Sequence, residues 1–136
     1  MNGERDLATL LATLEPVLHA EEWVFCSLPP DQAAALDIPY LGRFREAEGE
    51  TLIVPRGVAE RWAIAYTYPC RLITLNVHSS LAAVGFLAAI TAKLAAANIS
   101  VNPVSAYYHD HLLVPREQAE QALSLLSQFQ ASPQGR

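Results

Sequence analysis

The sequence predicts an α+β fold built from two related units. The first observation is a repeat: the residues LIVPR at 52–56 return as LLVPR at 112–116, and Ala-Glu follows each copy after two variable positions. Because proline is well tolerated at the first position of a helix, each copy predicts a strand that leads into a helix. The second observation is size: 136 residues, 51% of them apolar, suit one compact body in which two half-size units share a core.

The first unit begins with a short amphipathic helix over residues 7–14, where leucines recur at helical spacing after Asp6, a good N-cap residue. Aromatic, β-branched and turn residues then predict the remaining elements. These are a strand at 23–27, one or two helical turns at 32–36, a weak strand at 40–47, a strand at 51–54 and a helix at 55–63.

The second unit opens with a clearer strand that starts at Pro69. Alternation along a strand puts an apolar set on the core face, namely Ile73, Leu75 and Val77. The other face is semi-polar and carries Leu72, Thr74, Asn76 and His78. Ser79 and Ser80 then supply the N-cap of an Ala-rich helix that runs to about Ala97.

Asn98 suits the left-handed position that closes this helix. A strand over 99–108 follows, and Pro103 predicts that it lies at a sheet edge or carries a bulge, since proline cannot donate to a ladder. His109 and Asp110 are expected to form a two-residue hairpin turn before a strand at 111–114. The last helix has an apolar stripe of Ala119, Ala122, Leu123, Leu126 and Phe129.

This order of elements is ferredoxin-like, βαββαβ, in both units, with antiparallel sheets and helices on one face. Nothing after Phe129 has strand character, so the second unit lacks its last strand. We expect Val17 to Ala20, or a neighbouring chain, to supply it, in which case the two units share strands and interlock. The predicted boundaries are 1–68 for a degenerate N-terminal unit with a leading helix, 69–131 for the C-terminal unit and 132–136 for a flexible tail.

Charge and composition exclude several classes of protein. A net charge of −5 argues against nucleic-acid binding, which requires clustered Lys and Arg. Cys26 and Cys70 are the only cysteines and no secretory signal opens the chain, so we expect buried thiols and a cytoplasmic protein. The apolar stretch 81–97 is too short to span a membrane and contains Lys93.

The second unit also contains a longer pattern: His78-Ser79-Ser80-Leu81, Val84-Gly85-Phe86, Ile90, Leu94 and the run Asn98 to Asn102. With this pattern the second unit resembles the ACT domain over residues 71–126, and Asn98 stands in place of a frequent glycine. The continuation from Ser105 to Val114 is similar to small bacterial proteins with two tandem ACT-like units. The first unit is recognised mainly through the repeat, and it lacks a helix with such a glycine.

ACT domains are regulatory modules that mostly bind amino acids at an interface between two units, and the resemblance implies that role here. Because a helix N-terminus offers free N–H groups to a carboxylate, a glycine at that place lets a ligand approach the backbone. Gly85 is the foremost candidate, although glycine there is equally expected to serve close packing of the helix. The implied ligand-binding residues are Asn76, His78, Ser79, Ser80, Val84, Gly85, Phe86, Ser100, Val101 and Asn102.

Catalytic and metal-binding alternatives are weaker. No nucleophile-elbow pattern surrounds Ser79 or Ser80, so we expect no enzyme and no cofactor. His109 and His111, with Asp110 between them and His78 nearby in the fold, suggest a metal site as a distant alternative. Tyr107 and Tyr108 are expected to place one ring in the core and one at an interface.

Two hypotheses remain. The first is a non-enzymatic sensor that binds an amino acid or similar zwitterion and signals through altered association, with a homodimer favoured. The second is a ligand-free dimerisation module whose Ala-rich helix and open sheet face bury a partner. The ligand hypothesis expects the semi-polar strand face and Gly85 to line a cavity, whereas the dimerisation hypothesis expects a partner to cover them.

Overall fold

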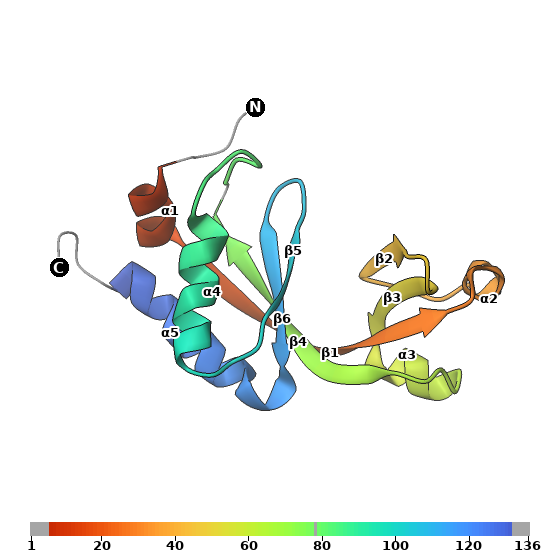
Figure 1. The fold of residues 1–136 in the computed structure, drawn as a ribbon. Coiled ribbons are helices and arrows are strands. Elements are labelled where there is room, and N and C mark those ends of the chain that lie inside the picture. Colours follow the sequence, from red (N-terminus) through yellow and green to blue (C-terminus); the bar gives the residue numbers. More distant parts are fainter. Residues whose placement is uncertain (1–5, 78, 132–136) are drawn as a thin grey trace. The chain divides into compact units, whose positions relative to one another are not determined.

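The computed structural model describes residues 6–77 and 79–131 (Figure 1). The helices are α1 (Leu7–Thr13), α2 (Pro30–Ala35), α3 (Arg56–Arg61), α4 (Phe86–Ala96), the 3-10 turn η1 (Arg116–Gln118) and α5 (Ala119–Ala131). The strands are β1 (Glu15–Leu28), β2 (Gly42–Arg45), β3 (Glu50–Pro55), β4 (Thr67–Asn76), β5 (Asn102–Ser105) and β6 (Asp110–Pro115).

The chain folds into two compact units that interleave along the sequence. One unit, here called the split unit, consists of Met1–Ala20 and Arg71–Arg136, and the other, the inserted unit, of Glu21–Cys70. Strands β1 and β4 run through both units. The prediction that Val17 to Ala20 supply the missing strand is confirmed, because β1 lies beside β4. The unit boundaries predicted from the sequence repeat, 1–68 and 69–131, stay a prediction.

Each unit has ferredoxin-like topology. The strand order is β1-β4-β6-β5 in the split unit and β4-β1-β3-β2 in the inserted unit. In ferredoxin-like topology the last strand lies beside the first, and that last place is taken by β1 in the split unit and by β4 in the inserted unit. The predicted fold class is confirmed. Strand β5 lies at a sheet edge, as Pro103 predicted, and it is shorter than expected.

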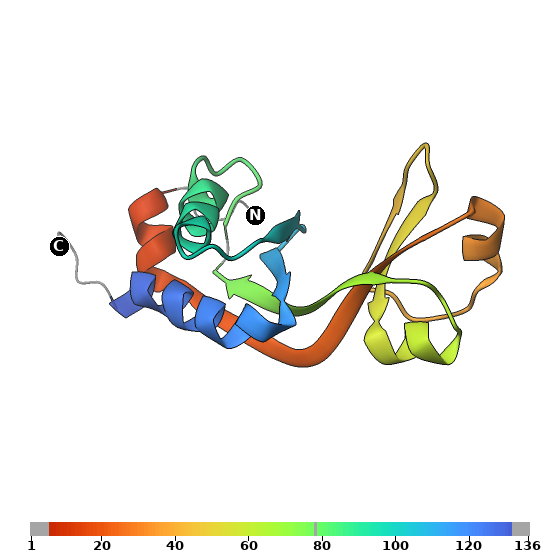
Figure 2. The ribbon, with the colours of Figure 1, turned by 60° about the horizontal axis from the view of Figure 1, so that its bottom comes forward.

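The core of the split unit lies between its sheet and three helices. Figures 1 and 2 show α1, α4 and α5 gathered on one side of the strands. Their apolar side chains meet Ile73 and Leu75 from β4 and Leu112 and Val114 from β6. The helices contribute Leu10, Phe86, Ile90, Leu94, Ala119, Ala122 and Leu126, all buried. Leu14, just before β1, and the partly buried Leu18 within β1 complete this core.

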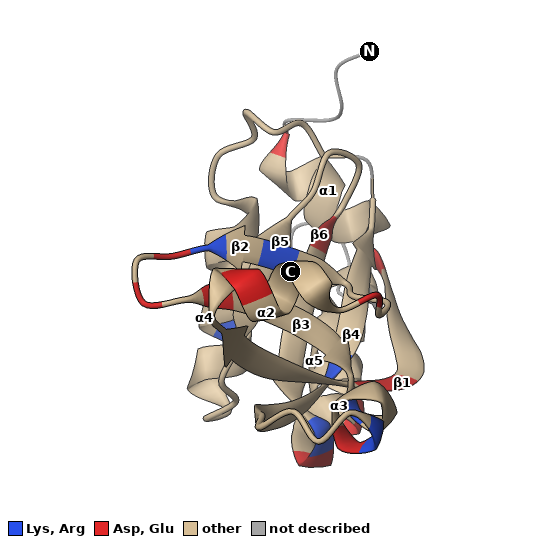
Figure 3. Cartoon of the chain, turned by 90° about the vertical axis from the view of Figure 1, so that its right-hand side faces the viewer, with Lys and Arg blue, Asp and Glu red and all other residues tan. Residues whose placement is uncertain are grey.

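The inserted unit has a smaller core. Its buried members are Val24, Cys26, Ala33, Leu52, Val54 and Ala59. The buried carboxylate of Glu50 pairs with Arg43 across the β2–β3 hairpin. Acidic and basic positions also alternate along α3 (Figure 3), where Arg56 pairs with Glu22 at 3.0 Å and with Glu60 at 3.2 Å. Hydrogen bonds with Glu22 and Tyr66 raise the pKa of Arg56.

The helix caps largely follow the sequence. The Asp6 carboxylate accepts a hydrogen bond from the Thr9 backbone N–H at 2.9 Å, which confirms the predicted N-cap, and bonds from Thr9 lower the pKa of Asp6. Asn98 adopts a φ of 61°, as predicted. The proline junctions differ by one residue from the prediction, because Pro55 and Pro115 end their strands as N-caps with extended ψ rather than as the first helical residue.

The prediction that Ser79 and Ser80 cap the Ala-rich helix is wrong. Helix α4 begins at Phe86, and the Ser80 hydroxyl instead accepts from the Ala82 N–H within the preceding loop. Gly85 is the N-cap, with a left-handed φ of 88° that L side chains rarely adopt. An added Cβ would meet Leu7 at an ordinary 3.6 Å, so the backbone conformation, and not close packing, requires glycine here.

The predicted two-residue turn at His109 and Asp110 is also wrong. Ser105 pairs with Asp110, and the Ala106 N–H donates to the His109 carbonyl at 3.0 Å, so the loop has four residues. Tyr107 and Tyr108 form its tip and are 68% and 64% exposed, with their rings edge to face. Neither ring enters the core, contrary to the expectation for one of them.

Cys26 and Cys70 are buried free thiols, as predicted. Burial raises the pKa of Cys26, and burial together with the charge of Glu22 raises the pKa of Cys70 to about 12, so both thiols stay protonated near neutral pH. Among the described residues, no helix has the length and apolar character needed to cross a membrane.

Gly49 gives a direct test of the β2–β3 hairpin. Its φ is 157°, and a Cβ would lie 2.8 Å from the Ser27 hydroxyl and 3.2 Å from the Leu28 carbonyl oxygen. We expect Gly49→Ala to lower the free energy of unfolding by about 1 to 3 kcal/mol, as measured by urea denaturation. Gly57→Ala is the control, because nothing lies within 4 Å of its added Cβ, and an equal loss in both variants would contradict this explanation.

Candidate functional site

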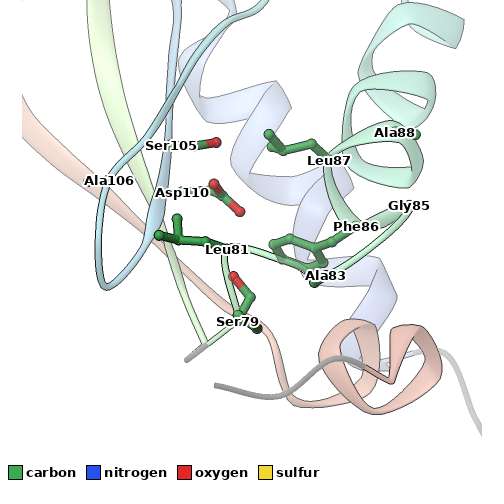
Figure 4. A pocket seen from close by; sticks show the side chains of 11 residues that line it. Ser79, Leu81, Ala83, Gly85, Phe86, Leu87, Ala88, Ser105, Ala106 and Asp110 are labelled. Atoms are coloured by element: carbon green, nitrogen blue, oxygen red, sulfur yellow. The ribbon is translucent and has the colours of Figure 1, made fainter. Parts of the chain in front are cut away.

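A pocket of about 190 Å³ lies in the split unit, between the N-terminus of α4 and the hairpin that joins β5 to β6. Three segments line it: the loop before α4, the first turn of α4 and the two ends of the hairpin (Figure 4). The lining residues are Ser79, Ser80, Leu81, Ala83, Gly85, Phe86, Leu87, Ala88, Ser105, Ala106 and Asp110. The space beside the loop that leads from β4 into α4 is therefore a pocket, and the protein's own side chains do not fill it.

The first turn of α4 provides hydrogen-bond donors at this pocket. The first intrahelical bond runs from the Ala89 N–H to the Gly85 carbonyl, so the N–H groups of Phe86, Leu87 and Ala88 precede the helical ladder. Gly85 has no side chain that could cap the helix, and among the described residues no side-chain hydrogen bond caps its first turn. Because the helix dipole adds partial positive charge here, this side of the pocket suits a carboxylate.

Three polar side chains line the pocket, two from the hairpin and one from the loop before α4. Figure 4 shows the carboxylate of Asp110 and the hydroxyls of Ser79 and Ser105 directed toward the space beside Phe86 and Leu87. Asp110 and Ser105 are paired in register across β6 and β5, so the two strands hold them together. A carboxylate with two hydroxyls forms an acceptor-rich group that suits a cation or an ammonium group.

The structure brings some of the predicted ligand-binding residues together. Ser79, Ser80, Gly85 and Phe86 line the pocket. Asn76, at the end of β4, and Val84, which is 83% exposed beside Gly85, do not. His78 lies outside the described residues.

Ser100, Val101 and Asn102 do not reach this pocket. Ser100 lies beside Ala95, Asn98 and Ile99 at the opposite end of α4, and an 11-residue helix is roughly 16 Å long. The chain returns along β5 toward the start of α4, so the far end of this strand, at Ser105, meets the pocket. The predicted residues Ser100, Val101 and Asn102 therefore lie at the opposite end of this segment from the pocket.

Asp110, Ser105 and Leu87 are pocket residues that the sequence analysis missed. Because aspartate is common in turns, the sequence predicts Asp110 in a turn, whereas in the structure it is the first residue of β6. The available signal was alternation: Leu112 and Val114 are core residues on the helix-facing side, so Asp110 shares that side with them.

The described residues of the semi-polar strand face, Leu72, Thr74 and Asn76, do not line the pocket. Thr74 lies in a row of hydrogen bonds, with its hydroxyl 2.8 Å from His19 Nε2 and 3.0 Å from His111 Nδ1. Burial lowers the pKa of His111, and the charges of His109 and His19 lower it further while Asp110 opposes them. Within residues 6–77 and 79–131, no group of three His, Cys, Asp or Glu side chains is placed to hold a metal ion.

The inserted unit has a different hollow. It measures about 360 Å³, is more open to solvent and is lined by Phe25, Cys26, Ser27, Thr51, Ala65, Tyr66 and Thr67. No charged side chain is among these described lining residues, and helix α2 does not contribute to it. The combination of helix amides and a carboxylate therefore belongs to the split unit.

Two ACT-domain family profiles match the sequence, one over residues 2–71 and the other over residues 67–128. The chain therefore belongs to the ACT-domain family, as its resemblance predicted. ACT domains are regulatory, non-catalytic modules that bind small-molecule ligands, and the chain falls into this class of regulatory ligand-binding modules.

Solved structures share the fold of this chain. A protein of unknown function from Vibrio cholerae, described as a possible transport protein, is 40% identical, with a TM-score of 0.84 over 91% of this chain and 95% of its own. A protein from Agrobacterium tumefaciens is 16% identical (TM-score 0.67, coverage 86% and 89%). The ligand-free regulatory subunit of aspartate kinase from Thermus thermophilus is 12% identical (TM-score 0.60, coverage 87% and 97%). The last two structures are similar to this chain in fold. A search of curated proteins gave no match.

Proposed function

We propose that this chain is a non-enzymatic regulatory protein that binds an amino acid or a similar zwitterion in the pocket of the split unit. The observation that carries the proposal is the pairing of opposite charge preferences across one small pocket. The amides of Phe86, Leu87 and Ala88 suit a carboxylate, and the oxygens of Ser79, Ser105 and Asp110 suit an ammonium group. A zwitterion satisfies both sides at once.

We further propose that ligand binding alters the association of the chain with a second copy. Large apolar side chains are exposed on the two loops that form the pocket, at Leu81 (69%), Val84 (83%) and the hairpin-tip tyrosines. Clustered exposed apolar residues are typical of association surfaces. A ligand that orders these loops would change that surface, and sedimentation with and without ligand measures the effect.

The experiment is a thermal-shift screen of the twenty amino acids against the full chain. A ligand that binds only the folded state stabilises it by about 2.7 kcal/mol at a hundredfold excess over its Kd, which raises the Tm by roughly several degrees for a chain of this size. No shift with any amino acid, together with a stable dimer in their absence, would favour the ligand-free dimerisation module instead.

Leu87→Trp tests whether such a ligand occupies this pocket. Figure 4 shows the Leu87 side chain directed from the first turn of α4 into the hollow, so the larger indole should fill part of the space that the ligand would occupy. We expect the Kd for the stabilising amino acid to rise about tenfold or more, the equivalent of roughly 1.4 kcal/mol, by isothermal titration calorimetry.

Ala92→Trp is the control for the same bulky side chain. Ala92 lies further along α4, is exposed and does not line the pocket. Its Kd should equal that of the wild type. Equal weakening in both variants would place the ligand elsewhere on the molecule.

A further inference from the structure

We propose that Asp110 determines the ligand class, so that the pocket selects small α-amino acids with aliphatic side chains. This inference rests on the proposed function and deepens it. Four features of the pocket carry it: its charge, the number of acceptors that line it, the apolar character of the remaining wall and its size.

The charge of the pocket excludes acidic ligands. Asp110 is the one charged side chain among the described lining residues, and these include no Lys, Arg or His. A second carboxylate or a phosphate on the ligand would face Asp110 without a cation to offset it, which is unfavourable in a partly enclosed site. A primary ammonium group has the opposite charge and is favoured.

The acceptors match an ammonium group in number as well as in charge. An ammonium group has three N–H donors and no acceptor. Asp110 and Ser105 on the hairpin, and Ser79 on the loop before α4, offer one carboxylate and two hydroxyls to the same pocket (Figure 4). Hydrogen bonds between two charged partners are about twice as strong as neutral ones. The carboxylate of Asp110 therefore contributes most of the discrimination for an amine.

The rest of the wall is apolar. Leu81, Phe86 and Leu87 face the hollow, with Ala83 and Ala106 beside them. A charged or strongly polar ligand side chain would find no partner there, and its desolvation would cost affinity. An aliphatic side chain gains from the same contacts.

Size narrows the class further. The pocket holds about 190 Å³, whereas a cavity of roughly 150 Å³ is known to accept benzene, a six-carbon ligand. Amino acids such as valine and leucine are slightly larger than benzene and fit this scale. Nucleotides are several times larger, and drug-sized ligands occupy pockets of roughly 300 to 1,000 Å³.

The decisive experiment compares L-leucine with 4-methylpentanoate, which is leucine without its amino group, on the wild type and on Asp110→Asn. We expect removal of the amino group to weaken binding to the wild type by about 10- to 100-fold and to have much less effect on the variant. The cycle isolates the contact between the amine and Asp110 from all other contacts of the ligand. Glu48→Gln, an exposed carboxylate of the inserted unit, is the control for loss of one negative charge and should bind leucine like the wild type.

Four outcomes decide the inference. Equal leucine affinity for wild type and Asp110→Asn overturns it, and so does tighter binding of aspartate or lysine than of leucine and valine to the wild type. If Asp110→Asn does not fold, the comparison of leucine with 4-methylpentanoate on the wild type still decides, because equal affinities contradict a role for the amine. If no amino acid binds the wild type, the proposed function itself fails and the inference falls with it.

Discussion

Residues 69–136 expressed alone are expected to stay unfolded, although they contain the whole C-terminal half of the repeat. The split unit takes Leu10 and Leu14, both fully buried, and the flanking Leu18 from the N-terminal segment. Truncation of a single buried leucine costs about 2 to 5 kcal/mol, and a domain has roughly 5 to 15 kcal/mol in total. Removal of the segment also takes away the strand beside β4 and helix α1, which packs on α4 and α5.

The control for this truncation is a protein that lacks the inserted unit. A short Gly-Ser linker joins residues 1–20 to residues 71–136. The Arg71 guanidinium donates to the His19 carbonyl at 3.0 Å, so the two ends to be joined lie next to each other. We expect this protein to fold, with cooperative thermal unfolding by circular dichroism. Cooperative unfolding of residues 69–136 alone would show that β1 is dispensable, and failure of the joined protein would show that the split unit depends on the inserted one.

The interleaving illustrates what the sequence could predict. The order of elements and the absence of strand character after Phe129 are local facts, and together with ferredoxin-like topology they require a strand from elsewhere. The predictions of the N-cap at Asp6, the left-handed residue at Asn98 and the edge strand at Pro103 are confirmed for the same reason. Each of these residue types has one dominant backbone role in its position. Such features need no knowledge of tertiary contacts.

The start of α4 was not predicted because two local preferences compete. Ser79 and Ser80 are strong caps, and Leu81 to Val84 can be helical, so the pattern favours an early start. Gly85 costs about 1 kcal/mol in a helix interior relative to alanine, and this was the signal for a later start. In the structure Gly85 takes a left-handed φ and starts the helix, so the N–H groups that precede the helical ladder belong to Phe86, Leu87 and Ala88.

The candidate site was predicted in its helical half and missed in its strand half. The first turn of α4 followed from the family resemblance and from the chemistry of helix ends, and both are tied to Gly85. Asp110 depends on the length of the β5–β6 loop, which sequence alone leaves open because Tyr107-Tyr108 and His109-Asp110 are both compatible with a turn. Moving the turn by two residues decides whether Asp110 lies in the loop or on the wall of the pocket.

Leu112→Ala is expected to lower the free energy of unfolding by about 3 to 4 kcal/mol, within the range for buried leucines. Leu112 is fully buried in the larger core, which also contains Leu75, Ile90 and Leu126. Three helices and the sheet hold those neighbours, so the hollow left by the lost side chain cannot close. The measurement is urea denaturation followed by circular dichroism, with an unchanged m-value to show that the folded and unfolded states keep their compactness.

The repeat provides the matched comparison, because Leu52 occupies the corresponding position in the inserted unit and is 2% exposed. Its core has fewer members, so its neighbours can move inward more easily, and we expect Leu52→Ala to cost about 2 kcal/mol. Leu81→Ala, at a position 69% exposed, should leave stability within about 0.5 kcal/mol of the wild type. Equal losses at Leu52 and Leu112 would mean that the size of the surrounding core does not control the cost, and a larger loss at Leu52 would make the inserted unit the better packed of the two.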